Sequence, residues 1–321
     1  MIVPVTVPVT GRVRRDPAPD GLVIIDKPAG FTSHDVVGKM RGIAATRKVG
    51  HAGTLDPMAT GVLVVGIGKA TRLLTHIVGA DKDYDATIRL GVGTTTEDAQ
   101  GEVTDVSDPG PLGLDQIVAA AATLTGDIMQ VPSSVSAIKV DGKRAYDRVR
   151  AGESVELKAR PATVAVFEVL SATPVATEHG PCVDVEARVS VSSGTYVRAL
   201  ARDLAAALGT FGHLTALRRT RVGGYQLDQA RTLDQLQGEV EQAGAITVLP
   251  LAQAAAGIMD VRELSSQEVT AIGYGQRLKT ENKGGAPRRF AGVDASGELI
   301  ALLEDDGTKI KPFLVFAPAS S

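Results

Sequence analysis

The stretch from Lys48 to Gly61 most constrains how this chain can fold, because its glycines and proline restrict the path of the backbone. Gly53 and the other two glycines allow turns and close approaches that other residues disfavour. Pro57 fixes its own φ and favours an extended conformation at Asp56. The stretch therefore predicts a loop that presents one carboxylate, Asp56, and one imidazole, His51. An ordinary Asp-Pro turn is the alternative interpretation.

Length and composition predict a globular protein with more than one domain. A chain of 321 residues suits one large domain plus a small one. Hydrophobic residues make up 44% and charged residues 22%, which excludes a disordered chain, and the apolar runs are too short to cross a bilayer. Cys182 is the single cysteine, so neither an intramolecular disulfide nor a Cys-rich zinc site can form. We expect a cytoplasmic protein with no metal site and no secretory signal.

The net charge of -3 does not favour an RNA partner, but the basic residues are clustered. Each cluster alone is typical of a solvated face, whereas four together favour a positive groove. The clusters are Arg12, Arg14 and Arg15; Lys39, Arg41, Arg47 and Lys48; Lys139, Lys143, Arg144, Arg148 and Arg150; and Arg218, Arg219 and Arg221.

Hydrophobic periodicity predicts a chain of mixed helices and strands. Strands are expected at residues 21–25, 62–65, 83–92, 163–170, 183–192, 217–225, 289–293, 298–304 and 313–316. Helices are expected at 33–42, capped by Thr32 or Ser33, and at 70–78, 114–124, 195–208 and 233–243, with one more capped at Ser265 or Ser266. Residues 93–108 and 171–182 are interpreted as loops. These elements divide the chain into an extension (1–20), a large domain (21–250) and a small β-rich domain (255–321).

Five sequence blocks, taken together, resemble one known family. They are GLVIIDKP (21–28), KVGH (48–51), TLDPMATG (54–61), DKDY (81–84) and SGTYVR (193–198). In this order they are similar to the bacterial tRNA pseudouridine-55 synthases, the TruB family. The resemblance implies an α+β fold, with a mixed, mainly antiparallel sheet flanked by helices and a PUA-like C-terminal domain. It also implies isomerisation of uridine 55 in the T loop of tRNA, without a cofactor.

The resemblance assigns catalytic roles to three residues. Asp56 is implied to be the essential carboxylate. Three roles are open to it: attack on the base, attack on the sugar, or removal of the C2' proton. Tyr84 is implied to stack on the uracil with its hydroxyl near the C5 proton, and core packing is the alternative. Arg198 would pair with Asp56 and keep it charged and oriented.

Five further residues are implied to bind the substrate. His51 resembles the histidine that stacks in the space vacated when the uridine is everted from the T loop. Tyr196 would line the pocket that receives the base. Leu217 would form an apolar wall under the base, unless it is ordinary core. Lys27 and Lys48 would serve either the structure or the RNA backbone.

Two other functions compete with a T-loop synthase. The first is a non-catalytic protein that binds tRNA and assists its folding, against which the set Asp56, Tyr84 and Arg198 argues. The second is a synthase of the same family that acts with a guide RNA, against which the length and the absence of lysine-rich tails argue. We therefore expect a monomer that acts on the T-arm stem-loop, with no membrane and no obligatory protein partner.

Overall fold

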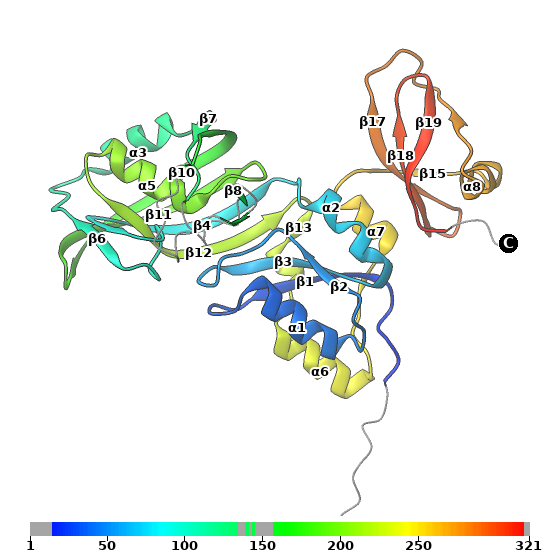
Figure 1. Cartoon of the computed structure of the whole chain (residues 1–321), viewed down its shortest axis with the longest axis horizontal. Helices are drawn as coiled ribbons and strands as arrows, with labels where there is room; N and C mark the ends of the chain where they lie inside the picture. The colour runs from blue at the N-terminus through cyan, green and yellow to red at the C-terminus, as the bar shows by residue number, and fades with distance from the viewer. Residues whose placement is uncertain (1–14, 134–138, 141–142, 145–156, 318–321) are drawn as a thin grey trace, which may run out of the picture.

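The computed structural model describes residues 15–133, 139–140, 143–144 and 157–317 (Figure 1). Within these ranges ten strands form one large sheet and five strands form a smaller C-terminal sheet. The large sheet is antiparallel except where β3 and β12 pair in parallel. No helix in these ranges has the length and apolar character needed to span a bilayer. The expected α+β class, with a mainly antiparallel sheet and a small β-rich C-terminal part, is confirmed.

The large sheet has the strand order β14-β1-β3-β12-β4-β11-β10-β7, with β2 beside β3 and β13 beside β12. Its strands are β1 (Gly21–Lys27), β2 (Val49–Ala52), β3 (Thr60–Ile67), β4 (Lys82–Leu90), β7 (Gly126–Gln130), β10 (Arg160–Thr177), β11 (Gly180–Val191), β12 (Gly212–Val222), β13 (Tyr225–Gln226) and β14 (Leu249–Pro250). Two separate hairpins are formed by β5 (Val92–Thr94) with β6 (Val103–Val106) and by β8 (Lys139–Val140) with β9 (Lys143–Arg144).

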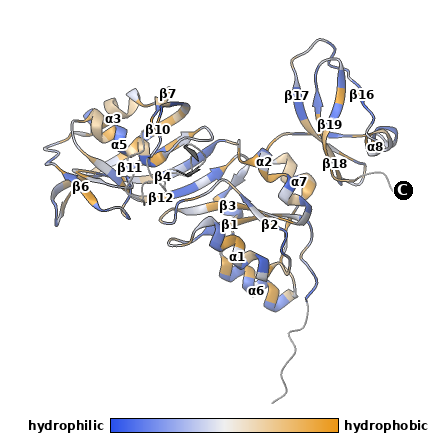
Figure 2. Cartoon of the chain, in the orientation of Figure 1, coloured by the Kyte–Doolittle hydropathy of each residue, from blue (hydrophilic) through white to orange (hydrophobic). Residues whose placement is uncertain are grey.

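One extended apolar core joins the large sheet to four helices. The helices are α1 (Ser33–Ile43), α3 (Leu114–Thr123), α5 (Val197–Ala207) and α6 (Leu233–Ala243). Apolar and polar residues alternate around α1 and α6, as an amphipathic helix requires (Figure 2). On β4, Tyr84, Ala86, Ile88 and Leu90 are buried on one face, as the period of two predicts. Thr32 caps α1 as expected.

The C-terminal sheet has the order β15-β17-β18-β19-β16. Its strands are β15 (Asp260–Glu263), β16 (Leu278–Lys279), β17 (Arg288–Val293), β18 (Leu299–Asp305) and β19 (Lys309–Val315), with α8 (Ser266–Gly273) beside them. The chain passes from one sheet to the other through α7 (Leu251–Ala256). The change of sheet falls close to the predicted boundary, and the division into domains stays a prediction.

A shared apolar cluster fastens the C-terminal sheet to the large domain. Leu73, next to α2 (Leu74–Ile77), belongs to the same buried cluster as Leu302 and Phe316 of the smaller sheet. Arg72 donates a hydrogen bond of 2.8 Å to the carbonyl of Val315, and its guanidinium lies 5.0 Å from the Phe316 ring centroid. The C-terminal sheet is therefore packed directly against the segment that leads into α2 and against α7.

The structure corrects three predicted elements. The loop expected at 93–108 contains most of the β5–β6 hairpin, whose second strand is exposed along its whole length and so shows no apolar alternation. The loop expected at 171–182 is instead a continuation of strands β10 and β11, which reverse direction only around residues 178–179. Pro174 is tolerated because β7 pairs only with Arg160 to Val164, which leaves the outer edge of β10 free at Pro174. The helix expected at 70–78 is split into the 3₁₀ helix η1 (Gly68–Arg72) and α2.

We expect Phe316→Ala to destabilise the protein by about 3 kcal/mol, because a large ring that is 3% exposed leaves a cavity in the cluster. Calorimetry of wild type should show one cooperative transition, since both sheets share that cluster. Tyr274→Ala is the control: Tyr274 is 69% exposed, and the change should cost less than about 0.5 kcal/mol. Two well-separated transitions in the wild-type protein would contradict a shared core.

Candidate active site

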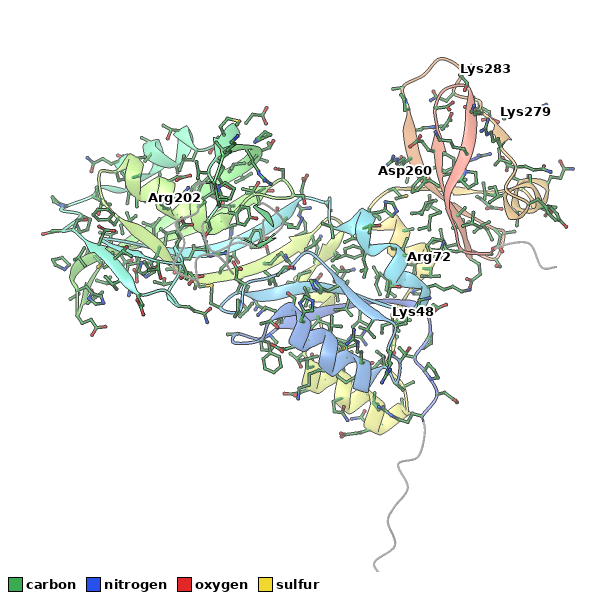
Figure 3. All side chains as sticks on the ribbon, viewed as in Figure 1. Lys48, Arg72, Arg202, Asp260, Lys279 and Lys283 are labelled. Carbon is green, nitrogen blue, oxygen red and sulfur yellow. The ribbon has the colours of Figure 1, made fainter. Side chains whose placement is uncertain are left out.

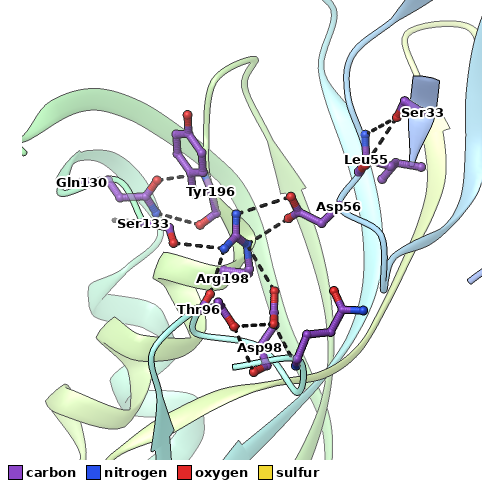
Figure 4. Close-up of polar contacts among 10 residues, drawn as sticks. Ser33, Leu55, Asp56, Thr96, Asp98, Gln130, Ser133, Tyr196 and Arg198 are labelled. Carbon is purple, nitrogen blue, oxygen red and sulfur yellow. Dashed lines mark hydrogen bonds and ion pairs between the residues drawn. The ribbon is translucent and has the colours of Figure 1, made fainter. Parts of the chain in front are cut away.

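Asp56 lies between β2 and β3 and forms an ion pair with the second residue of α5. Arg198 donates from Nε to Asp56 Oδ2 at 2.9 Å and from Nη2 to Asp56 Oδ1 at 3.4 Å (Figure 4). The Asp56 side chain is 37% exposed, whereas that of Arg198 is 6% exposed. Asp56 also closes the expected turn, because its carbonyl accepts from the amide of Ala59 at 3.1 Å. The carboxylate is thus held from one side and open to solvent on another.

Arg198 has further partners that fix the position of its guanidinium. Nη1 donates to the carbonyl of Thr96 at 2.8 Å and to Ser133 Oγ at 3.1 Å. A second carboxylate, Asp98 Oδ2, lies 3.8 Å from Nε, and the Asp98 side chain is only 6% exposed. A buried charge is tolerated only when it is paired and hydrogen-bonded. This network lets Arg198 reach Asp56 in one defined orientation.

Two side chains hold the backbone on either side of Asp56. The buried hydroxyl of Ser33, at the start of α1, accepts from the amide of Leu55 at 3.0 Å (Figure 4). The ammonium of Lys27, which is fully buried, donates to the carbonyls of Phe31 at 2.6 Å and Pro57 at 3.2 Å. Burial lowers the pKa of Lys27 to about 8, although Asp56 opposes the shift. Of the two roles expected for Lys27, its burial supports the structural one.

Tyr84 and Leu217 lie on neighbouring central strands. Tyr84 pairs with Arg219 of β12, which pairs in turn with Gly61 of β3, so the register aligns Tyr84 with the end of the Asp56 loop. Both side chains belong to the apolar core, at 8% and 7% exposure. Leu217 also lines a groove of about 570 Å³ together with Met58, but neither Asp56 nor Tyr84 lines it. The geometry accommodates Leu217 both as core and as a wall.

His51 lies on strand β2 rather than in the expected loop, opposite Val65. Its ring centroid is 5.4 Å from that of His34, in an edge-on arrangement. Burial lowers the pKa of His51, and the nearby His34 and Arg219 lower it further. The imidazole is therefore neutral at neutral pH, which suits stacking better than proton donation.

Tyr196 and Lys48 lie apart from the groove beside Leu217. Tyr196 precedes α5, where its backbone exchanges two hydrogen bonds with the Gln130 side chain, and it lines a separate hollow of about 170 Å³. Its ring points away from Asp56 (Figure 4). Lys48 is exposed at the start of β2 (Figure 3), where a phosphate could reach it.

Sequence reasoning missed Asp98, which lies in a segment interpreted only as a polar loop. A signal was present: Arg198 and Arg202 are four residues apart on one helix face, and Glu97 and Asp98 are adjacent acids. In the structure Arg202 Nη1 donates to Glu97 Oε1 at 2.6 Å, beside the contact between Arg198 and Asp98. Two arginines on one helix face predict that two acidic side chains pack against that face. The sequence does not indicate which two acids these are.

The fourth basic cluster, which we expected to contribute to a positive groove, is only partly exposed. Arg218 pairs with Asp26 at 2.7 Å, Arg221 pairs with Asp83, and Arg219 is fully buried. Of the first cluster only Arg15 is in the described ranges, and the side chains of the third lie outside them. The second cluster is exposed throughout: Lys39, Arg41, Arg47 and Lys48. Among the described residues, no group of three or more His, Cys, Asp or Glu side chains could hold a metal ion.

Comparison with known proteins gives one consistent family. Residues 41–197 match the TruB family pseudouridylate synthase N-terminal domain, 198–253 match the tRNA pseudouridylate synthase B C-terminal domain, and 259–317 match the tRNA pseudouridine synthase II C-terminal domain. The chain is 58% identical to tRNA pseudouridine synthase B of Paenarthrobacter aurescens, over 94% of this chain and 96% of that protein. It is 54% identical to the enzyme of the same name from Streptomyces avermitilis, over 93% and 97%.

Solved structures that resemble this chain include two assemblies. One chain of a Cbf5-Nop10-Gar1 complex matches with a TM-score of 0.68 and 27% identity, over 93% of this chain and 85% of that one. A chain of an H/ACA RNP bound to a substrate RNA containing 2'-deoxyuridine matches with a TM-score of 0.67 and 26% identity, over the same shares. The similarity to pseudouridine synthases thus covers more than nine-tenths of this chain, including the Asp56 loop.

We expect Ser33→Ala to destabilise the protein by about 1 to 3 kcal/mol, because it leaves the Leu55 amide without its buried acceptor. The loop should also open more often, which hydrogen exchange at residues 53–60 would detect. Ser171→Ala is the control, since Ser171 bonds only an exposed Glu186 and should change stability by less than about 0.5 kcal/mol. Equal exchange in the two variants would show that Ser33 does not hold the loop.

Proposed function

Because the chain belongs to the TruB family of pseudouridylate synthases, we propose that it isomerises uridine 55 in the T loop of tRNA to pseudouridine. The observation that carries this proposal is the ion pair between Arg198 and Asp56, in which a nearly buried guanidinium orients a partly exposed carboxylate. A protein that only bound and refolded tRNA would not need an oriented carboxylate in its loop. Modification is therefore the activity that the site supports best.

The reaction requires little beyond a carboxylate and a shaped pocket. The bond between C1' and N1 of the uridine breaks, the base rotates, and a bond forms between C1' and C5. The C5 proton passes to solvent, and N1 takes up one proton in exchange. Asp56 can assist as a nucleophile at the sugar or base, or as the base that removes the C2' proton. Each route needs a carboxylate aimed at the nucleotide, and Arg198 orients Asp56 by donating to both of its oxygens. No step requires a cofactor.

The remaining site residues fit the handling of a flipped base. Tyr84 lies in register with the end of the Asp56 loop, and we assign it stacking on the uracil. Leu217, on the adjacent strand, supplies an apolar wall. The neutral His51 stacks in the space left by the uridine, and Tyr196 lines the neighbouring hollow on the far side of Arg198.

RNA contact is assigned to the exposed second basic cluster and not to Arg218, Arg219 and Arg221. Lys39 and Arg41 lie in the second half of α1, and Arg47 and Lys48 follow before β2, so four exposed cations lie within ten residues of the chain and are available to phosphates. Phosphate contacts orient the RNA without reading its sequence. Recognition of the T arm then comes from its shape and from the everted base.

A stand-alone tRNA enzyme fits the similarities better than a guide-dependent one. Identity with the tRNA pseudouridine synthase B proteins of Paenarthrobacter aurescens and Streptomyces avermitilis is 58% and 54%, over at least 96% of their length. Identity with the chain from the Cbf5-Nop10-Gar1 complex is 27%. We therefore propose a monomer that modifies tRNA without a guide RNA or partner protein. Mapping pseudouridine in tRNA from cells with and without this protein tests the proposal, and an unchanged position 55 would overturn it.

Asp56→Asn should abolish turnover while tRNA affinity stays within about threefold, because the amide keeps the shape and removes only the charge. Release of tritium from C5-labelled uridine measures the reaction. Asp184→Asn is the matched control, since Asp184 also pairs with an arginine, Arg89 at 2.7 Å, and plays no part in the site. Multiple turnover by pure Asp56→Asn protein would rule out the essential role.

An isolated T-arm stem-loop should be a substrate for the purified chain alone, because the oriented carboxylate and the exposed cluster of Lys39, Arg41, Arg47 and Lys48 all lie in the large domain. Tritium release from the stem-loop and from whole tRNA is compared at saturating RNA. Activity on whole tRNA alone would show that distant contacts are required. Activity only after addition of a guide RNA would favour the competing family member.

A further inference from the structure

Arg219 is a fully buried arginine at the centre of the large sheet, among the largest side chains with no exposure. It lies on β12, between β3 and β4. Arginine is almost never fully buried unless its donors are satisfied. Its Nε donates to the carbonyl of Val62 at 2.7 Å, and its Nη2 donates to the carbonyl of Gly53 at 3.0 Å. Both partners are backbone atoms rather than carboxylates, and Nη1 is buried with no hydrogen-bond partner among the described residues.

These two carbonyls mark the two ends of the Asp56 loop. Strand β2 ends at Ala52, so Gly53 is the first residue of the loop, and Val62 is the third residue of β3. The backbones are also in close contact, because a Cβ on Gly61, whose φ is +96°, would lie 2.2 Å from the carbonyl oxygen of Arg219. One side chain thus joins the point where the loop leaves the sheet to the point where it returns.

We propose that Arg219 is a positioning residue that sets the span of the loop from Gly53 to Val62 and thereby places Asp56 for the reaction; this inference rests on the proposed function. Ser33 and Lys27 hold the loop at Leu55 and Pro57, whereas Arg219 is the one side chain in the described part of the protein that bonds the backbone on both sides of it. A shift of about 1 Å in a reacting group can cost about 100-fold in rate. Removal of Arg219 therefore changes the rate of the chemical step more than the binding of RNA.

The charges around Arg219 argue that it is not there for stability alone. Burial lowers the pKa of Lys27 and of Lys82 to about 8, and the charge of Arg219 adds to both shifts. Its guanidinium therefore lies close enough to two buried ammonium groups to repel them. An apolar side chain would avoid this repulsion but could not bond the two carbonyls. Lysine could not replace it either, because a single ammonium does not reproduce the planar fork.

The test compares Arg219→Ala with wild type at saturating T-arm RNA in single turnover. We expect the rate of tritium release to fall about 100-fold and the affinity for RNA to change by less than about threefold. Arg89→Ala is the matched control: Arg89 is on the adjacent strand β4 and pairs with Asp184, away from the loop. Its single-turnover rate should equal that of wild type.

Chemical rescue separates positioning from general damage. Millimolar guanidinium chloride should restore part of the rate of Arg219→Ala, because the ion fits the space left by the side chain and can bond both carbonyls. Sodium chloride at the same ionic strength should restore none of the rate. If Arg219→Ala does not fold, Arg219→Lys takes its place, with the same loss of rate expected. A folded variant, by circular dichroism, with the wild-type rate overturns the inference.

A readout that does not depend on activity distinguishes this inference from the proposed function. Hydrogen exchange should accelerate at residues 53–62 in Arg219→Ala or Arg219→Lys and should stay unchanged there in Arg89→Ala. If the wild-type protein releases no tritium from the T arm, the proposed function fails, and the exchange result still decides whether Arg219 holds the loop. Unchanged exchange in the Arg219 variant overturns the inference.

Discussion

The active-site geometry depends on one contact, the ion pair between Arg198 of α5 and Asp56, which are 142 residues apart in the chain. Helix α5 packs on the β4 and β12 part of the sheet, whereas Asp56 belongs to a loop of β2 and β3, so the pair bridges two regions of the same sheet. The pair can form only if the sheet, the helix and the loop all have their observed positions. The second carboxylate, Asp98, keeps the nearly buried guanidinium between two negative groups.

Backbone carbonyls do much of the work of shaping this loop. The carbonyls of Gly53, Pro57 and Val62 accept from buried cations, and the Leu55 amide is bonded by a buried hydroxyl. A loop held through its main chain leaves its side chains available for the substrate, and here the carboxylate of Asp56 is 37% exposed. The same arrangement accounts for two of the buried cations, Lys27 and Arg219, whose partners are carbonyls of this loop and its flanks.

The sequence predicted those parts of the fold that local patterns determine. The buried face of β4 and the cap of α1 follow from period two and from Thr32, and both are observed. The pairing of Arg198 with Asp56 followed from a resemblance and is also observed. The burial of Arg219 could not be predicted, because its partner Val62 is 157 residues away and three basic residues within four positions are typical of a surface. Pro174 misled for a related reason: whether a proline interrupts a strand depends on which edge is paired.

The joint between the two sheets has a consequence for how RNA can be held. Arg72 and Leu73 precede α2, and the chain continues directly into β4, which carries Tyr84, so the surface that docks the C-terminal sheet is continuous with the floor of the site. A part attached through a shared core cannot swing on a tether, and its distance from Asp56 is a constant of the molecule. An RNA that contacts both the C-terminal sheet and the Asp56 loop must span that fixed distance. For such an RNA the overall shape, as well as the loop, determines whether the uridine reaches the carboxylate.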